Sequence, residues 1–208
     1  AIFGGSGAGK STLTRLLSGL IKPSKGRILL DGQCLSQLDI LTWRRQLGLI
    51  TQEPVIFDDT LFFNVALKHQ KDANQDEKFL VKSLISKLNL NSAIPSTAEG
   101  FNMRIGERGL RFSGGQRQRL FLAREVFRKP EFLILDEATS ALDRESEGLV
   151  QNFIETEMAD KTICLIAHRL ETIRNCDFII FMHEGSIIDI GPYKDVIERN
   201  PDYFAGVK

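Results

Sequence analysis

Apolar residues recur three and four positions apart soon after residue 10 of this 208-residue chain. Such spacing puts them on one side of a helix, which predicts an amphipathic helix near the start of the chain. These residues are Leu13, Leu16, Leu17, Leu20 and Ile21. The pattern turns helical again from residue 60 to about residue 90, with apolar positions on one face. They are Leu80, Val81, Leu84, Ile85 and Leu88.

Short apolar runs bounded by turn residues predict strands. The candidate strands cover residues 27–30, 47–52, 131–137 and 161–168, and a hairpin is expected over 177–191. Helical patterns follow three of these segments, at residues 144–158, 169–176 and 193–200. Strands separated by helices imply an α/β fold with a mostly parallel sheet covered on both faces. The turn after residue 30 adds a small antiparallel part.

The middle of the chain differs from its two ends. Residues 58–128 are mainly helical and polar in pattern and contain a glycine-bearing loop at 99–112, so we expect a helical lobe inserted into the α/β core. Residues 1–208 are predicted to form one domain. Only three residues precede a glycine-rich motif that normally follows a complete strand, so the amino-terminal part of the domain is expected to be missing.

Composition excludes some classes of partner. The 27 basic residues equal the 27 acidic ones, so no overall field favours nucleic acid or an anionic membrane surface. The apolar runs are far shorter than the roughly 20 residues needed to cross a bilayer. Cys34, Cys164 and Cys176 have no CxxC spacing, which favours buried, reduced thiols and a reducing compartment.

The sequence FGGSGAGKST at residues 3–12 fits the pattern GxxxxGK(S/T). Glycines let the backbone curl until several N–H groups point inward, and the helix that begins there adds the positive end of its dipole. Both features suit a phosphate chain, whereas the plainer alternative is a flexible turn that caps a helix. The candidate binding residues are Gly4, Gly5, Ser6, Gly7, Ala8, Gly9, Lys10, Ser11 and Thr12.

Two adjacent carboxylates, Asp136 and Glu137, end the apolar run at residues 131–137. Ligands of open α/β sheets bind at the carboxyl ends of the strands. Beside a phosphate loop, the first carboxylate suits Mg²⁺ and the second can orient or deprotonate an attacking water. The alternative is that both are solvated turn residues.

A second helix start that could bind an anion is expected at residues 111–127, RFSGGQRQRLFLAREVF. Ser113 is a suitable helix cap, and Gly114 and Gly115 leave backbone N–H groups accessible. A glycine hinge before an ordinary helix is the alternative. The arginines of this segment are expected to form a solvated face and not a nucleic-acid patch. They are Arg117, Arg119 and Arg124.

Taken together, these motifs resemble the nucleotide-binding domain of an ABC transporter, over essentially the whole chain. The phosphate loop resembles Walker A, Gln52 the Q-loop, residues 113–116 the SGGQ signature, and Asp136 with Glu137 the end of Walker B. Residues 140–143, SALD, resemble the D-loop, and His168 in IAHRL resembles the switch histidine. The sequence IGERG at 105–109 resembles exporter-type members, in which the ATPase follows a membrane domain on the same chain.

The resemblance implies ATP and Mg²⁺ as ligands and assigns roles to single residues. Lys10 would hold the β and γ phosphates, and Ser11, Gln52 and Asp136 would hold Mg²⁺. Glu137 would be the general base. Two further residues complete the catalytic group that the family implies: His168, which would grip the γ phosphate and position the water, and Gln52.

The family also implies partners. Two domains sandwich two nucleotides head to tail, so that the signature of one domain contacts ATP held by the other. Ser113, Gly114, Gly115, Gln116 and Asp143 would make these contacts. A transmembrane domain, expected on the same full-length chain, would dock near residues 52–63 and hold the ATPase at the cytoplasmic face of a membrane.

Some positions depart from the family or leave choices open. Phe112 stands where leucine is usual, and the aromatic residue that stacks on adenine would lie upstream of residue 1. Phe57, Phe62 and Phe63 are equally compatible with exposed docking anchors and with core packing. A soluble ABC-type ATPase and a small-molecule kinase are the rival functions. The transported substrate is not indicated by these residues.

Overall fold

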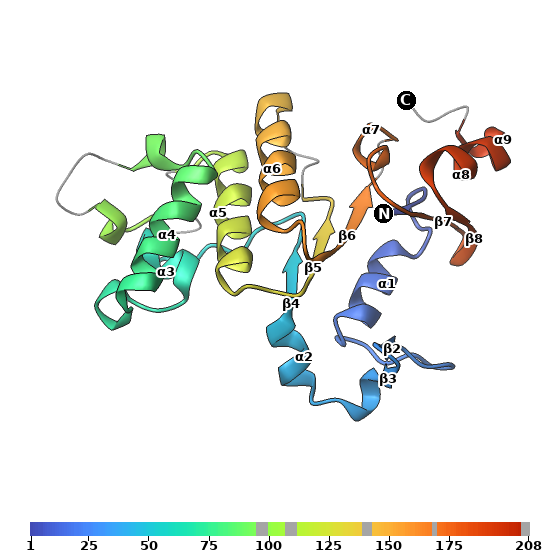
Figure 1. Cartoon of the computed structure of the whole chain (residues 1–208), viewed down its shortest axis with the longest axis horizontal. Coiled ribbons are helices and arrows are strands. Elements are labelled where there is room, and N and C mark those ends of the chain that lie inside the picture. Colours follow the sequence, from blue (N-terminus) through green and yellow to red (C-terminus); the bar gives the residue numbers. More distant parts are fainter. Residues whose placement is uncertain (95–99, 107–111, 139–142, 168–169, 205–208) are drawn as a thin grey trace. The chain divides into compact units, whose positions relative to one another are not determined.

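The computed structural model describes residues 1–94, 100–106, 112–138, 143–167 and 170–204 (Figure 1). The chain divides into two compact units. The first unit comprises Ala1–Leu49, Phe132–Glu137 and Thr162–Lys208, and the second comprises Ile50–Glu131 and Ala138–Lys161.

A six-stranded sheet has the strand order β4-β5-β6-β1-β7-β8. Its strands are β1 (Ile2–Phe3), β4 (Leu47–Ile50), β5 (Phe132–Asp136), β6 (Thr162–Ala167), β7 (Ile179–His183) and β8 (Ser186–Gly191). β1 pairs in parallel with β6 and β7, β5 pairs in parallel with β6, and β8 runs antiparallel to β7. The predicted mostly parallel sheet is therefore confirmed, and the carboxyl ends of β5, β6 and β1 share one edge.

The small antiparallel part is also confirmed. β2 (Leu29–Leu30) pairs with β3 (Gln33–Cys34) across the predicted Asp31–Gly32 turn, and a 3-10 turn, η1 (Leu35–Gln37), follows. The first of these strands is shorter than the predicted residues 27–30, because only two residues join the ladder.

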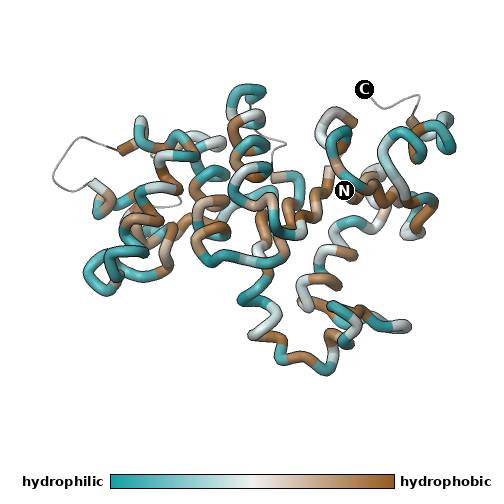
Figure 2. The backbone as a smooth tube through the Cα atoms, in the orientation of Figure 1, coloured by the Kyte–Doolittle hydropathy of each residue, from teal (hydrophilic) through white to brown (hydrophobic). Residues whose placement is uncertain are grey.

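Both faces of the sheet are covered by apolar side chains. Along β7, Ile180 and Met182 pack in one cluster while Ile179 and Phe181 pack in another, as expected when side chains alternate between faces. Helices α1 (Lys10–Leu17) and α2 (Ile40–Gln46) contribute to the first cluster. Helices α7 (Leu170–Ile173), α8 (Tyr193–Arg199) and α9 (Pro201–Phe204) contribute to the second. In Figure 2 the strands β5 to β7 are mainly hydrophobic in colour.

The first helix is shorter than its apolar pattern predicts. It ends at Leu17, because Gly19 adopts a left-handed φ of 64° and the next amide, that of Leu20, donates to Arg15 O instead of continuing the helix. Leu20 and Ile21 are consequently exposed, not on the buried face of a helix. The expected helix at residues 169–176 is likewise shorter, since α7 spans four residues.

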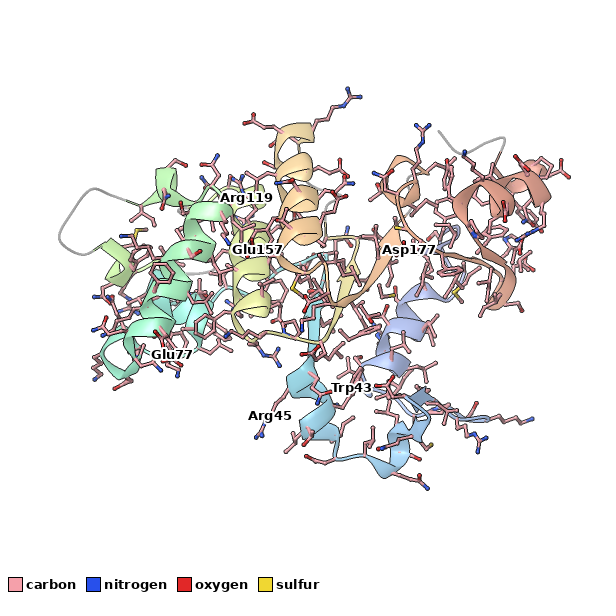
Figure 3. The ribbon with its side chains drawn as sticks, in the orientation of Figure 1. Trp43, Arg45, Glu77, Arg119, Glu157 and Asp177 are labelled. Atoms are coloured by element: carbon pink, nitrogen blue, oxygen red, sulfur yellow. The ribbon has the colours of Figure 1, made fainter. Side chains whose placement is uncertain are left out.

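The second unit contains four α-helices in its described part. They are α3 (Leu61–Ala66), α4 (Gln75–Lys87), α5 (Gly114–Phe127) and α6 (Arg144–Glu157). Short 3-10 turns join them: η2 (Gln70–Asp72), η3 (Asn91–Ala93) and η4 (Gly100–Asn102). Lys87 Nζ lies 2.8 Å from an oxygen of Glu157, labelled in Figure 3, and this ion pair joins α4 to α6. None of the helices described is long and apolar enough to cross a membrane.

Helix α2 was not among the predicted elements, although Asp39 caps it by accepting the amides of Leu41 and Thr42. Trp43 of this helix lies beside α1 and is 8% exposed (Figure 3). Its indole Nε1 donates to Leu17 O at 2.9 Å, so it satisfies a carbonyl at the end of α1. The ring also packs 6.0 Å from Phe132 of β5.

Replacement of Trp43 by Phe should therefore destabilise the first unit by about 2 kcal/mol, because it removes both a hydrogen bond and core volume. Calorimetry of the complete protein should show this unit melting about 4–8 °C lower. Tyr203→Phe is the control, since Tyr203 is 46% exposed and should change the melting temperature by less than about 2 °C. Equal melting of the Trp43 variant and the parent would contradict this role.

Candidate functional site: a phosphate loop beside two carboxylates

The phosphate loop connects β1 to α1 and has a conformation that glycine makes accessible. Gly7 and Gly9 have left-handed φ values of 79° and 96°, and Gly9 is the N-cap residue just before α1. A Cβ on Gly4 would lie 2.2 Å from Met182 O, so this position has no room for a side chain. The loop therefore requires glycine for two separate reasons, backbone conformation and close packing on β7.

Lys10 is only 5% exposed and folds back over the loop. Its Nζ donates to Gly4 O at 2.8 Å and to Gly5 O at 2.9 Å. Burial lowers the pKa of Lys10, whereas the nearby carboxylates of Glu137 and Asp136 act to raise it. The ammonium is thus held at the mouth of the loop by carbonyl groups and faces two acidic residues.

A cavity of about 230 Å³ lies inside the loop. Its lining consists of Ser6, Gly7, Ala8, Gly9, Lys10, Ser11, Thr12 and Glu137. The volume is smaller than the roughly 300–1,000 Å³ of a cavity that encloses a whole small ligand. It suits a phosphate chain whose remaining part lies outside the cavity. The structure thus brings most of the predicted loop residues together with the predicted base.

The two carboxylates reach this edge through the register of the sheet. Asp136 is the last residue of β5 and pairs with Ile166 of β6. The next amide, that of Glu137, donates to Ile166 O at 3.2 Å, after which Glu137 adopts a left-handed φ of 53°. A positive φ is uncommon for residues other than glycine and often accompanies a functional position. β5 therefore ends so that Glu137 turns into the cavity.

Other predicted site residues belong to the second unit. Gln52 is exposed in a bend after β4. Ser113 caps α5 through a reciprocal pair of hydrogen bonds with Gln116, at 3.2 and 2.8 Å, with Gly114 and Gly115 in the first turn. This arrangement is a capped helix start with two glycines in its first turn.

Asp143 caps α6 in the same unit by accepting the amide of Ser146 at 2.8 Å. That hydrogen bond lowers the pKa of Asp143, which keeps the carboxylate charged. His168 and residues 140–142 lie outside the described residues, so the proposed switch histidine and most of the D-loop stay predictions.

The oxygen donors near the cavity suit Mg²⁺ only if a bound phosphate supplies further oxygen ligands. No group of three or more His, Cys, Asp and Glu side chains that could hold a metal occurs in the described ranges. Ser11 lines the cavity, and the Asp136 carboxylate is close enough to influence the charge on Lys10. A hydroxyl and a carboxylate are oxygen donors that Mg²⁺ accepts when phosphate oxygens complete its shell.

The three cysteines are free thiols, each partly buried and not fully enclosed. Burial raises the pKa of Cys164 to about 11 and also raises that of Cys176. Both groups are therefore protonated at neutral pH, in line with a structural role.

The expected solvated arginine face on this helix is wrong for Arg124, which is buried. It is 4% exposed, and its guanidinium donates to Asn64 O, Val55 O and Asn64 Oδ1 at 2.6, 2.6 and 2.9 Å. It also lies 4.8 Å from the centre of the Phe57 ring. Burial lowers the pKa of Arg124 to about 10, so it remains charged at neutral pH. Arg124 is therefore buried and not on a solvated face, and it binds the chain at residues 55–57.

Asn64 completes this network and was not singled out by the sequence. The side chain is fully buried. Its Oδ1 accepts a hydrogen bond from the Phe57 amide at 2.9 Å, and its Nδ2 donates to Phe57 O at 2.9 Å. Of the three phenylalanines left undecided, Phe57 is 41% exposed and Phe62 is buried, while Phe63 packs edge-on against Phe57. Val55 is also exposed. The side chains of Val55 and Phe57 therefore project from a segment whose backbone is hydrogen-bonded to Arg124 and Asn64.

Comparison with known proteins gives a consistent result. The family model described as ABC transporter matches residues 1–140. ABC transporter B family member 14 of Arabidopsis thaliana is 42% identical over 203 residues, 98% of this chain and 16% of that protein. The ATP-dependent lipid A-core flippase of Ralstonia nicotianae is 41% identical over 203 residues, which cover 98% of this chain and 34% of the flippase.

A solved structure agrees with these sequence matches. The structure of a bacterial Atm1-family ABC exporter with ATP bound superimposes with a TM-score of 0.87 at 35% identity, covering 98% of this chain and 36% of that one. The chain therefore spans about a sixth to about a third of the length of the proteins it matches.

Replacement of Arg124 by Met should destabilise the second unit by about 3 kcal/mol, because the buried Asn64 O and the partly buried Val55 O both lose their guanidinium donor. The measurement is the chemical denaturation midpoint of the complete protein, followed by a probe in this unit. Lys82→Met, an exposed change on α4, is the control and should cost less than about 0.5 kcal/mol. A midpoint shift no larger than the control's would show that the network contributes little.

Proposed function

Since the chain belongs to the ABC transporter family, we propose that it binds and hydrolyses ATP to power export or flipping of a substrate across a membrane. The observation that carries the proposal is the cavity shared by the phosphate loop, Lys10 and Glu137. The matched proteins include one named as a lipid A-core flippase and a solved exporter. These relatives favour membrane transport over a soluble ABC-type ATPase.

The residues of the cavity suit phosphoryl transfer to water. The loop amides and the amino end of α1 supply partial positive charge for the phosphate oxygens. Lys10 adds a full charge that is already desolvated, so its attraction for phosphate is stronger than it would be in water. Mg²⁺, when bound with ATP at Ser11 and Asp136, supplies further neutralisation of the phosphate charge.

Glu137 is the proposed general base because it lines the cavity together with the loop residues. A carboxylate in this place can accept a proton from a water molecule that attacks the γ phosphate. Its neighbour Asp136 is the last residue of β5 and is the proposed ligand of Mg²⁺. The two acidic residues thus have different roles, which follow from their different places on the backbone. His168 and Gln52 are proposed to complete the site.

A second nucleotide-binding domain is the proposed partner. The capped start of α5 has two glycines in its first turn, and a helix start of this kind suits the phosphates of an ATP held by another domain. ATP would then join two domains head to tail, with Asp143 and residues 113–116 facing the partner's nucleotide. Hydrolysis would release the pair, because the contacts depend on the γ phosphate.

A transmembrane domain is the other proposed partner, and it would attach the ATPase to the cytoplasmic face of a membrane. Val55 and Phe57 are the exposed apolar side chains of the segment after Gln52, and Arg124 with Asn64 hold their backbone. Such a rigid apolar projection suits the short helices of a membrane domain. The transported substrate would be selected by that domain.

Replacement of Glu137 by Gln should lower ATP turnover of the complete protein at least about 100-fold, since the amide cannot accept the proton. The dissociation constant for ATP should stay within about threefold. Steady-state hydrolysis and binding of a fluorescent ATP analogue measure the two effects. Glu131→Gln is the matched control, because Glu131 precedes the same strand and its side chain is 64% exposed. Undiminished turnover in the Glu137 variant would refute the assignment of the base.

Replacement of Ser113 by Arg should abolish hydrolysis of ATP while each phosphate loop still binds nucleotide with an unchanged dissociation constant, because Ser113 acts on the partner's ATP. Loss of the helix cap is controlled by Asn74→Arg, which removes an equivalent capping box from α4. The control should retain turnover. Normal turnover in the Ser113 variant, or equal loss in both variants, would count against the head-to-tail arrangement.

A further inference from the structure

The turn between β7 and β8 touches the phosphate loop from outside the sequence motif. Glu184 and Gly185 form this turn with left-handed φ values of 47° and 77°. The Gly185 amide donates to Ala8 O at 3.2 Å. β7 lies beside β1 in the sheet, so the loop and the turn leave neighbouring strands at the same edge (Figure 1).

The end of β7 contacts the loop at two further places. Met182 O occupies the space where Gly4 would carry a Cβ. The Met182 methyl group and Gly185 Cα lie 3.6 and 3.5 Å from the Cβ position of Gly9. Met182 and Ala8 are both buried in the same apolar cluster. Contacts at Gly4, Ala8 and Gly9 thus hold the loop at its beginning and at its end.

Peptide geometry turns the contact at Ala8 into a constraint on binding. The carbonyl of Ala8 and the amide of Gly9 belong to one planar peptide group and point in opposite directions. When Ala8 O is directed at Gly185 N, the Gly9 N–H is directed away from the turn. Gly9 lines the cavity, and because glycine has no Cβ its backbone can adopt other orientations in the absence of such a constraint.

Two other carbonyls of the loop have a different side-chain donor. Gly4 O and Gly5 O accept from Lys10 Nζ, whose charge is also the obvious partner of a phosphate. The bond from Gly185 to Ala8 O uses no group that phosphate would compete for. It can therefore persist while Lys10 changes partners.

We propose that the β7–β8 turn is a positioning element for the triphosphate: the Gly185 amide fixes the Ala8–Gly9 peptide so that the Gly9 N–H faces the phosphate. The inference rests on the proposed function of the cavity as an ATP site. It assigns part of the preorganisation of that site to a residue that contacts no nucleotide. Gly185 would act on affinity more than on the chemical step, because it orients a group that binds phosphate.

The test is Gly185→Val in the complete protein. A β-branched residue strongly disfavours the left-handed region, so the turn must change and the amide must leave Ala8 O. The chain offers a matched control in Gly32→Val: Asp31 and Gly32 form a turn with φ values of 47° and 82°, and the Cβ position of each of these two turn glycines meets nothing within 4 Å. The same strain is thereby introduced at a turn for which the described part of the structure shows no hydrogen bond to the phosphate loop.

We expect Gly185→Val to raise the dissociation constant for a fluorescent ATP analogue about tenfold and the KM for ATP in parallel, with kcat within about twofold. Gly32→Val should leave the dissociation constant and KM unchanged. A folded Gly185 variant with parental affinity would overturn the inference, as would an equal loss of affinity in the control. Failure of the unchanged protein to bind ATP would instead refute the proposed function itself.

Gly185→Ala provides a second test if Gly185→Val lowers the melting temperature of the protein so far that it does not fold. Alanine at a φ of 77° is strained less than valine, and its Cβ would meet nothing within 4 Å, so this change strains the turn more mildly. It should raise the dissociation constant about threefold, whereas Gly32→Ala should leave it unchanged. Unchanged affinity in the folded Gly185→Ala variant would then reject the positioning role.

Discussion

The direction of a few backbone amides in the phosphate loop is the constraint on which the rest of the site depends. Amides can point into the cavity only if the carbonyls of the same segment point outward, and outward carbonyls that are buried require donors. Lys10 satisfies Gly4 and Gly5, and Gly185 satisfies Ala8. The glycines make this geometry accessible, and the surrounding donors make it the stable one.

The position of β1 in the sheet supplies these donors. β1 has only two residues but lies between β6 and β7, so its carboxyl end meets the ends of both neighbours. On one side, Ile166 fixes the amide of Glu137. On the other side, β7 brings Met182 to Gly4. A sheet built from residues far apart in sequence thereby places the base and the loop support around a single cavity.

The sequence predicted most of what depends on local pattern, although it missed α2, and it missed what depends on distant partners. The glycine motif, the Asp136–Glu137 pair and the Ser113 cap follow from residue type and spacing, and so does the mostly parallel sheet. The burial of Arg124 does not, because its acceptors on Asn64 and Val55 become neighbours only after folding. The Glu184–Gly185 hairpin was expected from its turn residues, but its bond to Ala8 was not.

The strained backbone of Glu137 shows how local sequence and contacts between distant residues act together. A glutamate in the left-handed region is unfavourable by itself, and the sequence gives no sign of it. The sheet enforces it, since β5 pairs with β6 through Asp136 and the Glu137 amide is still bound to Ile166 O. Beyond that bond the chain must leave the plane of the sheet at once, which carries the carboxylate to the cavity. The backbone, more than the flexible side chain, therefore determines where the proposed base can act.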